Sequence, residues 1–180
     1  MAYGVLIKNR VAAMNVDSIN RSASGSYINI ENGHIFRLDS QSTTSGSSEV
    51  WEISTGTADG STLDNMWMAC SPPVVITNSQ YKGLDPDPRN FTNLLGMVLD
   101  AFRPYEGDVI TLSADAISGS PSTGNYVVVV SGSHRMAWQS AAGSGSSLCL
   151  KLLSETYISI GSDAIDSQRV LAYKLQVISN

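Results

Sequence analysis

The sequence predicts an all-β fold, a small β-barrel or sandwich, and three observations support this. Short alternating or β-branched runs recur along the chain, separated by Gly, Ser, Asn and Asp. Charged residues make up only 15% of the 180 residues, whereas long surface helices need many Glu, Lys and Arg side chains. The hydrophobic fraction of 42% is enough for a core, so the fold requires neither a metal nor disulfides.

Residues 1–24 are predicted to form an N-terminal arm or a first strand. Tyr3, Val5 and Ile7 alternate in this stretch and would share one face of a strand. Two alternatives stay open for them. They add a strand to the sheet edge of a neighbouring protein, or they begin the barrel of their own chain. The remainder of the stretch is predicted to be a polar tail.

Residues 25–83 are predicted to form an N-terminal β portion that starts with a hairpin. A β-prone run at 27–30 leads into Asn32 and Gly33, a pair typical of tight hairpin turns. Residues 34–38 alternate again and are predicted to return alongside the first run. The whole chain is expected to form either one shared barrel or two β lobes.

The remainder of this portion contains two Trp-containing strands, at 49–53 and 65–70. A Ser/Thr/Gly-rich stretch at 40–48 has no apolar content and is predicted to be a loop. Alternating prolines at 84–89 exclude regular structure there, because each proline removes a donor and fixes the backbone. That segment is predicted to be a linker between the two portions of the chain.

Residues 90–180 are predicted to form a barrel-like C-terminal β portion. The unbroken apolar run at 126–130 indicates a strand that is buried on both faces. Residues 148–153 and 156–160 form either one bent strand or two. All the expected strand segments of this portion are residues 108–112, 126–130, 135–138, 148–160 and 170–178.

Charge and hydropathy exclude two classes of partner, nucleic acids and membranes. The net charge is −5 and the Lys and Arg residues are scattered singly, so no basic stripe is available for a phosphate backbone. No apolar stretch approaches the roughly 18 residues that a membrane-spanning helix needs. Cys70 and Cys149 both lie in apolar runs, which favours buried free thiols over a disulfide.

Residue types that carry chemistry are sparse. His34 and His134 both stand beside turns, and nothing near either one in the sequence indicates a serine triad. The two cysteines lack the spacing of a zinc site. The acidic pair at 85–87 lacks the further ligands and the glycine of a calcium loop. We therefore expect no enzymatic activity, no catalytic residue, no metal site and no cofactor.

The three tryptophans allow a second kind of function. Trp51, Trp67 and Trp138 could form a platform on which sugars stack. Each lies within an alternating run, however, where packing into the core explains an aromatic residue, and this interpretation is favoured.

Several segments resemble a known family when they are taken in order. Residues 28–38 (INIENGHIFRL) are similar to the ENG-containing hairpin of small accessory proteins from tailed-phage head modules. Residues 90–93 and 101–112 resemble the family's F-x-N and A-x-R-x-Y-x-x-GD stretches. The GNYVV run at 124–128 resembles its GDY-V-V strand, with Asn125 in place of the usual acid. The likeness spans roughly residues 26–178. The departures are the serine-rich loop at 40–48 and the Trp-containing second strand.

The resemblance implies a structural virion protein that binds the outside of a bacteriophage capsid and decorates or cements it. Its partner would be the major capsid protein, with self-association on the capsid as a further expectation. It would be made in the cytoplasm of the bacterial host and end on the capsid surface. Tyr3, Val5 and Ile7 are then the candidate capsid contacts. The alternative is a carbohydrate- or host-surface-binding β module of a phage tail or head fibre.

Overall fold

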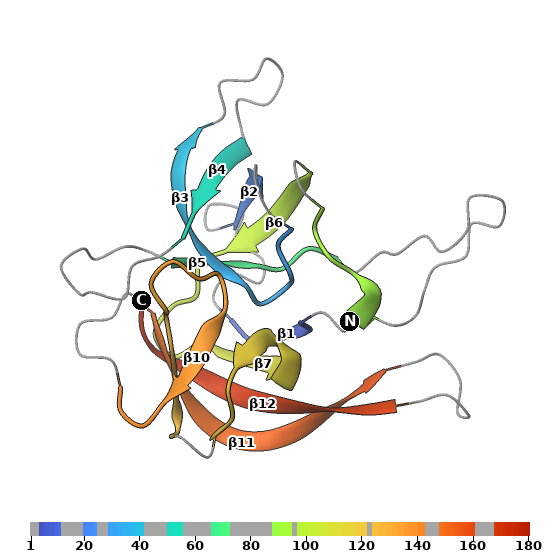
Figure 1. The fold of residues 1–180 in the computed structure, drawn as a ribbon, viewed down its shortest axis with the longest axis vertical. Coiled ribbons are helices and arrows are strands. Elements are labelled where there is room, and N and C mark those ends of the chain that lie inside the picture. Colours follow the sequence, from blue (N-terminus) through green and yellow to red (C-terminus); the bar gives the residue numbers. More distant parts are fainter. Residues whose placement is uncertain are drawn as a thin grey trace, which may run out of the picture.

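The computed structural model is an all-β protein, as the sequence predicts (Figure 1). The described residues contain no α-helix, and 3₁₀ turns stand between some of the strands. The described residues are 4–11, 20–24 (backbone only), 29–41, 50–55, 66–72, 88–94, 97–121, 124–142, 148–160 and 168–180.

The larger unit is a seven-stranded sheet. Its strands pair antiparallel except at one edge, where β10 and β8 run parallel. In spatial order they are β1 (Leu6–Arg10), β7 (Val109–Ser113), β12 (Gln168–Ser179), β11 (Cys149–Ile160), β9 (Tyr126–Val128), β10 (Met136–Gln139) and β8 (Ile117–Ser118).

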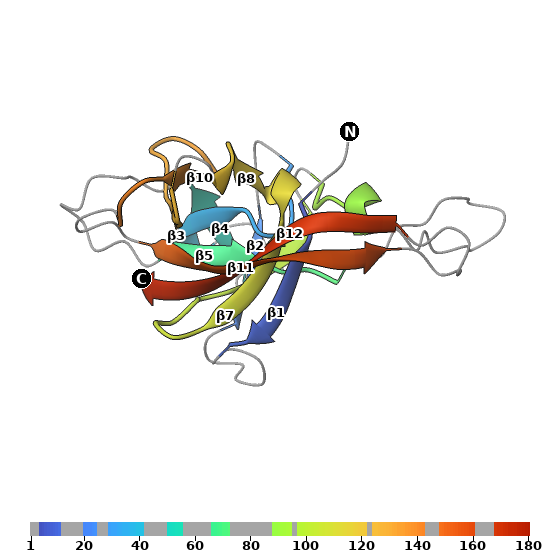
Figure 2. The same cartoon turned by 90° about the horizontal axis from the view of Figure 1, so that it is seen from below.

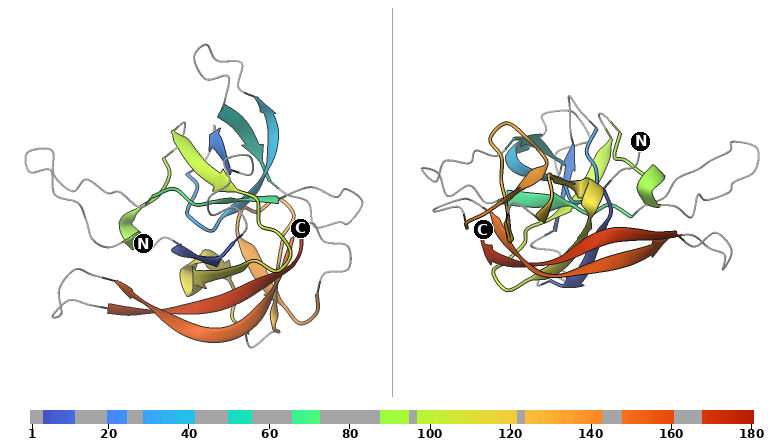
Figure 3. Two further views of the ribbon diagram at one scale, coloured as in Figure 1. Left: turned by 180° about the vertical axis from the view of Figure 1, so that it is seen from behind. Right: turned by 60° about the horizontal axis from the view of Figure 1, so that its bottom comes forward.

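The smaller unit is a closed five-stranded barrel that lies against one face of the sheet (Figures 1 and 3). Strand β2 pairs parallel with β4 and antiparallel with β6, and the second pairing closes the ring. In spatial order the strands are β2 (Asn20–Ser24), β4 (Val50–Ser54), β3 (Ile35–Gln41), β5 (Met66–Ala69) and β6 (Val98–Phe102). The 3₁₀ turns are η3 (Pro88–Asn90) and η4 (Ala114–Ala116).

One hydrophobic core joins the two units. It combines barrel residues such as Met68 and Phe102 with sheet residues such as Leu112 and Leu175, and all four are fully buried. A second cluster fills the barrel interior around Phe36. Because the largest cluster crosses the boundary, barrel and sheet bury apolar surface against each other.

The strands predicted for the C-terminal half are confirmed. β9 and β10 pair antiparallel, and Val127 and Val128 are buried, as the apolar run at 126–130 predicts. β11 is one strand rather than two, bent by a register shift between Leu152 and Ser154. One face of β12 points inward, since Tyr173 and Leu175 belong to the shared core.

The N-terminal stretch contains two strands of this chain's own fold, one more than the sequence predicts. Leu6 pairs with Leu112, so residues 6–10 form the edge strand of the chain's own sheet. The predicted polar tail is wrong at residues 20–24, which form barrel strand β2. That strand has no alternating apolar pattern, and backbone pairing with β4 and β6 specifies it instead.

The turn at Asn32 and Gly33 is present, but the predicted hairpin around it is wrong. The amide of His34 donates to the carbonyl of Glu31, and Gly33 has φ +88°, a value that favours glycine. Ile30 does not pair with β3; it forms a bridge with Asn93 instead. A partner far along the chain therefore replaces the local one.

Strand pairing does not follow the division of the chain at residues 84–89. Strand β6 follows that segment in sequence yet completes the barrel, and β1 precedes it yet joins the sheet. Pro88 begins η3, while residues 84–87 and most of the loop at 40–48 lie outside the described residues.

The outer part of β11 and β12 extends past the other strands (Figure 2). β9 pairs with β11 only at residues 149–151, and β7 pairs with β12 only at 172–176. Within the described sheet, residues 153–160 therefore have no partner strand other than β12, and residues 168–171 have none other than β11. We call these two segments the ribbon.

Candidate functional site

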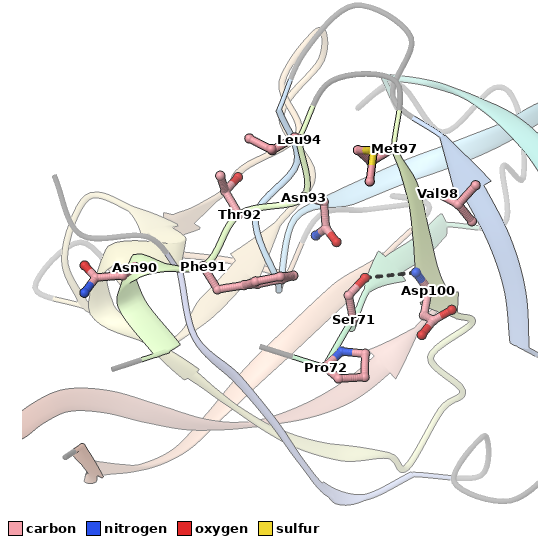
Figure 4. Close-up of a pocket in the computed structure, with 10 residues that line it drawn as sticks. All are labelled: Ser71, Pro72, Asn90, Phe91, Thr92, Asn93, Leu94, Met97, Val98 and Asp100. Carbon is pink, nitrogen blue, oxygen red and sulfur yellow. Dashed lines mark hydrogen bonds between the residues drawn. The ribbon is translucent and has the colours of Figure 1, made fainter. Parts of the chain in front are cut away.

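An open pocket of about 520 Å³ lies beside the start of β6, and we call it the groove (Figure 4). It combines the segment after η3, the start of β6 and the segment after β5. Its lining residues are Ser71, Pro72, Asn90, Phe91, Thr92, Asn93, Leu94, Met97, Val98 and Asp100.

The alternation of β6 explains why the groove is apolar. Leu99 and Ala101 point into the barrel and are buried, so Val98 and Asp100 point outward. Val98 is 57% exposed and Met97 is 61% exposed. Apolar side chains therefore line the outside of the barrel, where they are exposed to water and do not stabilise the isolated chain by burial.

Backbone contacts hold the polar residues of the groove in place. The side-chain amide of Asn93 donates to the Ile30 carbonyl at 2.8 Å, and the two residues also exchange backbone hydrogen bonds. The Ser71 hydroxyl accepts from the Asp100 amide at 2.9 Å, and the Asp100 carbonyl accepts from Cys70 at 2.8 Å. These bonds use the backbone of Asp100, so its carboxylate faces outward.

The groove is suited to binding. Asp100 carries the only ionisable side chain among its described lining residues, and its carboxylate forms no ion pair with a described residue. Apolar walls with one unpaired carboxylate fit an apolar side chain that lies next to a cation.

A second polar cluster, around His34 and His134, lies at the junction of barrel and sheet. His34 is buried, and its Nδ1 accepts from the Glu31 amide at 3.2 Å. The His134 ring donates through Nδ1 to the Ile35 carbonyl at 2.9 Å, while the Ile35 amide donates to the His134 carbonyl at 2.8 Å. The bonds between His134 and Ile35 thus link the two units, whereas the bond of the His34 ring is local.

Burial in this junction makes both imidazoles harder to protonate. Burial, together with the nearby charges of His134 and Arg135, lowers the pKa of His34 to about 4. Burial also lowers the pKa of His134, although the bond to Ile35 opposes this. Arg135 itself donates through Nη2 to the carbonyls of Asp115 and Ile117. Because these Arg135 contacts are to backbone carbonyls, they indicate a structural role for the junction.

The two cysteines are free. Cys149 is buried in β11. Burial raises the pKa of the Cys70 thiol, and the Lys8 ammonium, 3.9 Å from its Sγ, acts in the opposite direction. Lys8 also lies 5.3 Å from the ring centroid of Phe102, so its charge is directed inward over the core.

The three tryptophans do not share one surface. Trp138 is buried and packs edge-to-face on Tyr173, with ring centroids 5.0 Å apart. Trp67 packs against the barrel interior from β5. Trp51 is half-buried on β4, and β3 separates β4 from β5.

Comparison with protein-family models, with curated proteins and with solved structures finds no match. Within the described part of the chain, no three His, Cys, Asp or Glu side chains gather closely enough to hold a metal ion. No helix of the described segments has the length and apolarity to cross a membrane.

The predicted contact residues Tyr3, Val5 and Ile7 fall in different environments. Tyr3 lies outside the described residues. Val5 is buried in a cluster with Ile158 of the ribbon, whereas Ile7 is 39% exposed on β1. The outer edge of β1 has no partner strand among the described residues.

The ribbon presents a second exposed apolar surface. Tyr157 is 55% exposed and Leu153 is 47% exposed. The Arg169 guanidinium lies 5.1 Å from the ring centroid of Tyr157, in a cation–π contact. Arg89 of η3 donates to the Gln168 side chain at 2.9 Å and anchors the end of the ribbon.

Sequence reasoning missed both the groove and the ribbon surface. One signal for the groove is the apolar run at 94–99, which is too continuous for a strand that buries a single face. The signal for the ribbon is the length of β11 and β12, because the strands beside them are too short to cover it.

Proposed function

We propose that this chain is a structural, protein-binding protein that decorates or cements a bacteriophage capsid. The proposal starts from the resemblance at residues 28–38, 90–93 and 101–112. In the fold, Ile30 of the first segment bonds to Asn93 of the second. Support also comes from the turns of these motifs, whose residues have structural roles in the fold.

Two motif glycines and one acid illustrate this. Gly33 has φ +88°, and a Cβ there would lie 2.8 Å from Cδ2 of Leu112, so a larger residue would be strained and would displace Leu112. Gly107 has φ +93° in the next turn. Asp108 is buried there and accepts from the Tyr105 amide at 2.9 Å. We therefore assign these motif residues a structural role.

The observation that carries the proposal is where the exposed apolar side chains lie. Among the described residues, the large ones fall into three outward places: Ile7 at the edge of the sheet, the groove, and the ribbon. The imidazoles with shifted pKa values lie inside the fold, at the junction of its two units. Exposed apolar patches on a rigid β body are typical of proteins that dock on other proteins.

We propose the open edge of β1 as the contact with the major capsid protein on the outer face of the virion. An open edge can accept an extended segment of a partner through backbone hydrogen bonds. Ile7 would then pack on that segment. A register shift between Lys8 and Arg10 limits regular pairing to the first part of the strand.

The test is binding of the full chain to purified capsid shells, with a glycan array as the contrasting assay. Ile7→Asp is a better variant than deleting residues 1–9, because the deletion also removes the strand that pairs with β7. We expect Ile7→Asp to weaken shell binding by about tenfold or more, since burying an isoleucine contributes about 1.5–3 kcal/mol. Gln139→Asp is the matched control, an exposed strand position near the opposite edge of the sheet.

Two results would contradict the proposal at different levels. Unchanged shell binding by a folded Ile7→Asp chain removes the edge contact but leaves decoration standing. Failure of the unmodified chain to bind shells, together with specific glycan binding, supports the carbohydrate-binding alternative instead.

A further inference from the structure

We infer that the ribbon of one copy docks in the groove of a second copy of this chain. Tyr157 and Arg169 would form one side of the contact, and Val98 and Asp100 the other. This goes beyond capsid decoration, because the contact is between identical chains and can be measured without a shell.

The ribbon has the properties of a docking element. In the described sheet its two segments pair with no strand other than β11 and β12, and a two-stranded ribbon alone is marginally stable in water. Tyr157 and Leu153 are each about half exposed on it, which leaves apolar surface to be covered. Tyrosine and arginine are also among the residue types that contribute most to protein interfaces.

The groove supplies a concave counterpart. Its volume of about 520 Å³ lies within the range of pockets that enclose a bound group. Leu94, Met97 and Val98 line it and are each more than half exposed. An aromatic side chain buries about 150–250 Å² when it is enclosed, so the tyrosine ring is a suitable occupant.

The charges of the two surfaces are complementary. Arg169 stacks on Tyr157, and its guanidinium forms no ion pair with a described residue. The Asp100 carboxylate in the groove is likewise without an ionic partner among the described residues. Insertion of Tyr157 beside Val98 would bring the two opposite charges together, and an arginine can bind a carboxylate through two parallel hydrogen bonds.

A second copy is favoured over an unrelated partner because both halves of the contact are on this chain. Within one chain the contact stays unmade, because Tyr157 is 55% exposed and the groove is open. The Arg89–Gln168 hydrogen bond holds the end of the ribbon beside η3, so the ribbon is anchored in place before it meets a neighbour. An anchored element loses less entropy on binding.

The experiment is sedimentation velocity on the full chain over a range of concentrations. We expect concentration-dependent association of the unmodified chain. Arg169→Asp and Asp100→Arg should each weaken it by about tenfold or more, because each places like charges against each other. The combined variant Arg169→Asp/Asp100→Arg should restore association, since it exchanges the two charges. Lys151→Asp is the matched control, an exposed cation elsewhere on β11 that should leave association unchanged.

The charge exchange keeps the test independent of folding damage, and circular dichroism of each variant checks the fold. A chain that stays monomeric at every concentration overturns the inference. So does a folded combined variant that fails to recover association. A third result would also overturn the inference: the unmodified chain stays monomeric, and Asp100→Arg loses binding to shells. The groove would then contact the capsid shell and not a second copy of this chain. The sedimentation result is independent of the shell assay, so the two proposals fail separately.

Discussion

The barrel and the seven-stranded sheet are both β structures, but they are specified differently. The sheet contains β11 and β12, which are 12 residues each and pair along their whole length as a hairpin. The barrel strands have four to seven residues, and the ring closes through β2 and β6, which are distant in sequence. Local pattern defines the long hairpin of the sheet, whereas closure between distant strands defines the barrel.

The barrel also depends on the sheet for its core. Its own interior cluster is small, while Ile35, Met66, Met68 and Phe102 belong to the cluster shared with the sheet. We therefore expect the two units to unfold together, although they differ in architecture.

The largest expected effect comes from cutting into the shared core. Phe102→Ala should lower the free energy of unfolding by about 3–5 kcal/mol, the usual cost of removing a buried phenylalanine. Urea denaturation measures it, followed by fluorescence of chains that keep only Trp67 in the barrel or only Trp138 in the sheet. Coincident transitions are expected in both; two separate midpoints would show that the barrel is an independent unit.

Acid is the next test of the junction. Because the folded pKa of His34 is about 4 and its unfolded value is about 6.5, the unfolded chain binds more protons between these values. Stability is therefore complete above about pH 6.5 and falls as pH drops towards 4, by about 3 kcal/mol from this residue. His134 acts in the same direction. Thermal melts of His34→Gln should show a weaker dependence over this range; an unchanged slope would contradict it.

A smaller effect is expected where Asn180 links the sheet to the barrel. Its side chain accepts from the Met66 amide at 2.9 Å and donates to the carbonyls of Met66 and Pro104 at 3.0 and 2.7 Å. Asn180→Ala should cost about 1–3 kcal/mol, because it leaves partly buried backbone groups without partners. Asn125→Ala, at an exposed position, is the control and should change the melting temperature little. Equal changes in melting temperature for the two variants would contradict the role of Asn180 as a link between sheet and barrel.

The same difference decides what could be predicted from sequence. The sheet strands were predictable because their apolar residues alternate over long runs, as in β12. Asn20–Ser24 was not, since it is polar and becomes a strand only through its two neighbours. Val98–Phe102 was missed because Val98 is apolar yet points outward. The groove was missed for the same reason, and because the Ile30–Asn93 bridge that positions it joins distant segments.

The candidate contact residues were predicted only in part. Alternation correctly places Ile7 in a strand, whereas Val5 lies just before β1, and alternation cannot tell which positions another element will cover. Val5 is buried because residues of the ribbon reach it, among them Ile158 and Ile160. Ile7 keeps its exposure.

The adjacency of β1 and β7 has a consequence for the order of folding. The Val5 amide donates to the Ser113 hydroxyl, a contact between residues 108 positions apart, and all the barrel strands lie between them in sequence. On the ribosome, Leu6–Arg10 is made long before its partner and must wait for the whole barrel to be synthesised. Contacts between residues so far apart in sequence form slowly, so docking of this strand should be a late event in folding. During that delay the strand is a target for chaperones, and pairing of the first strand of one nascent chain with β7 of another would give a domain-swapped product.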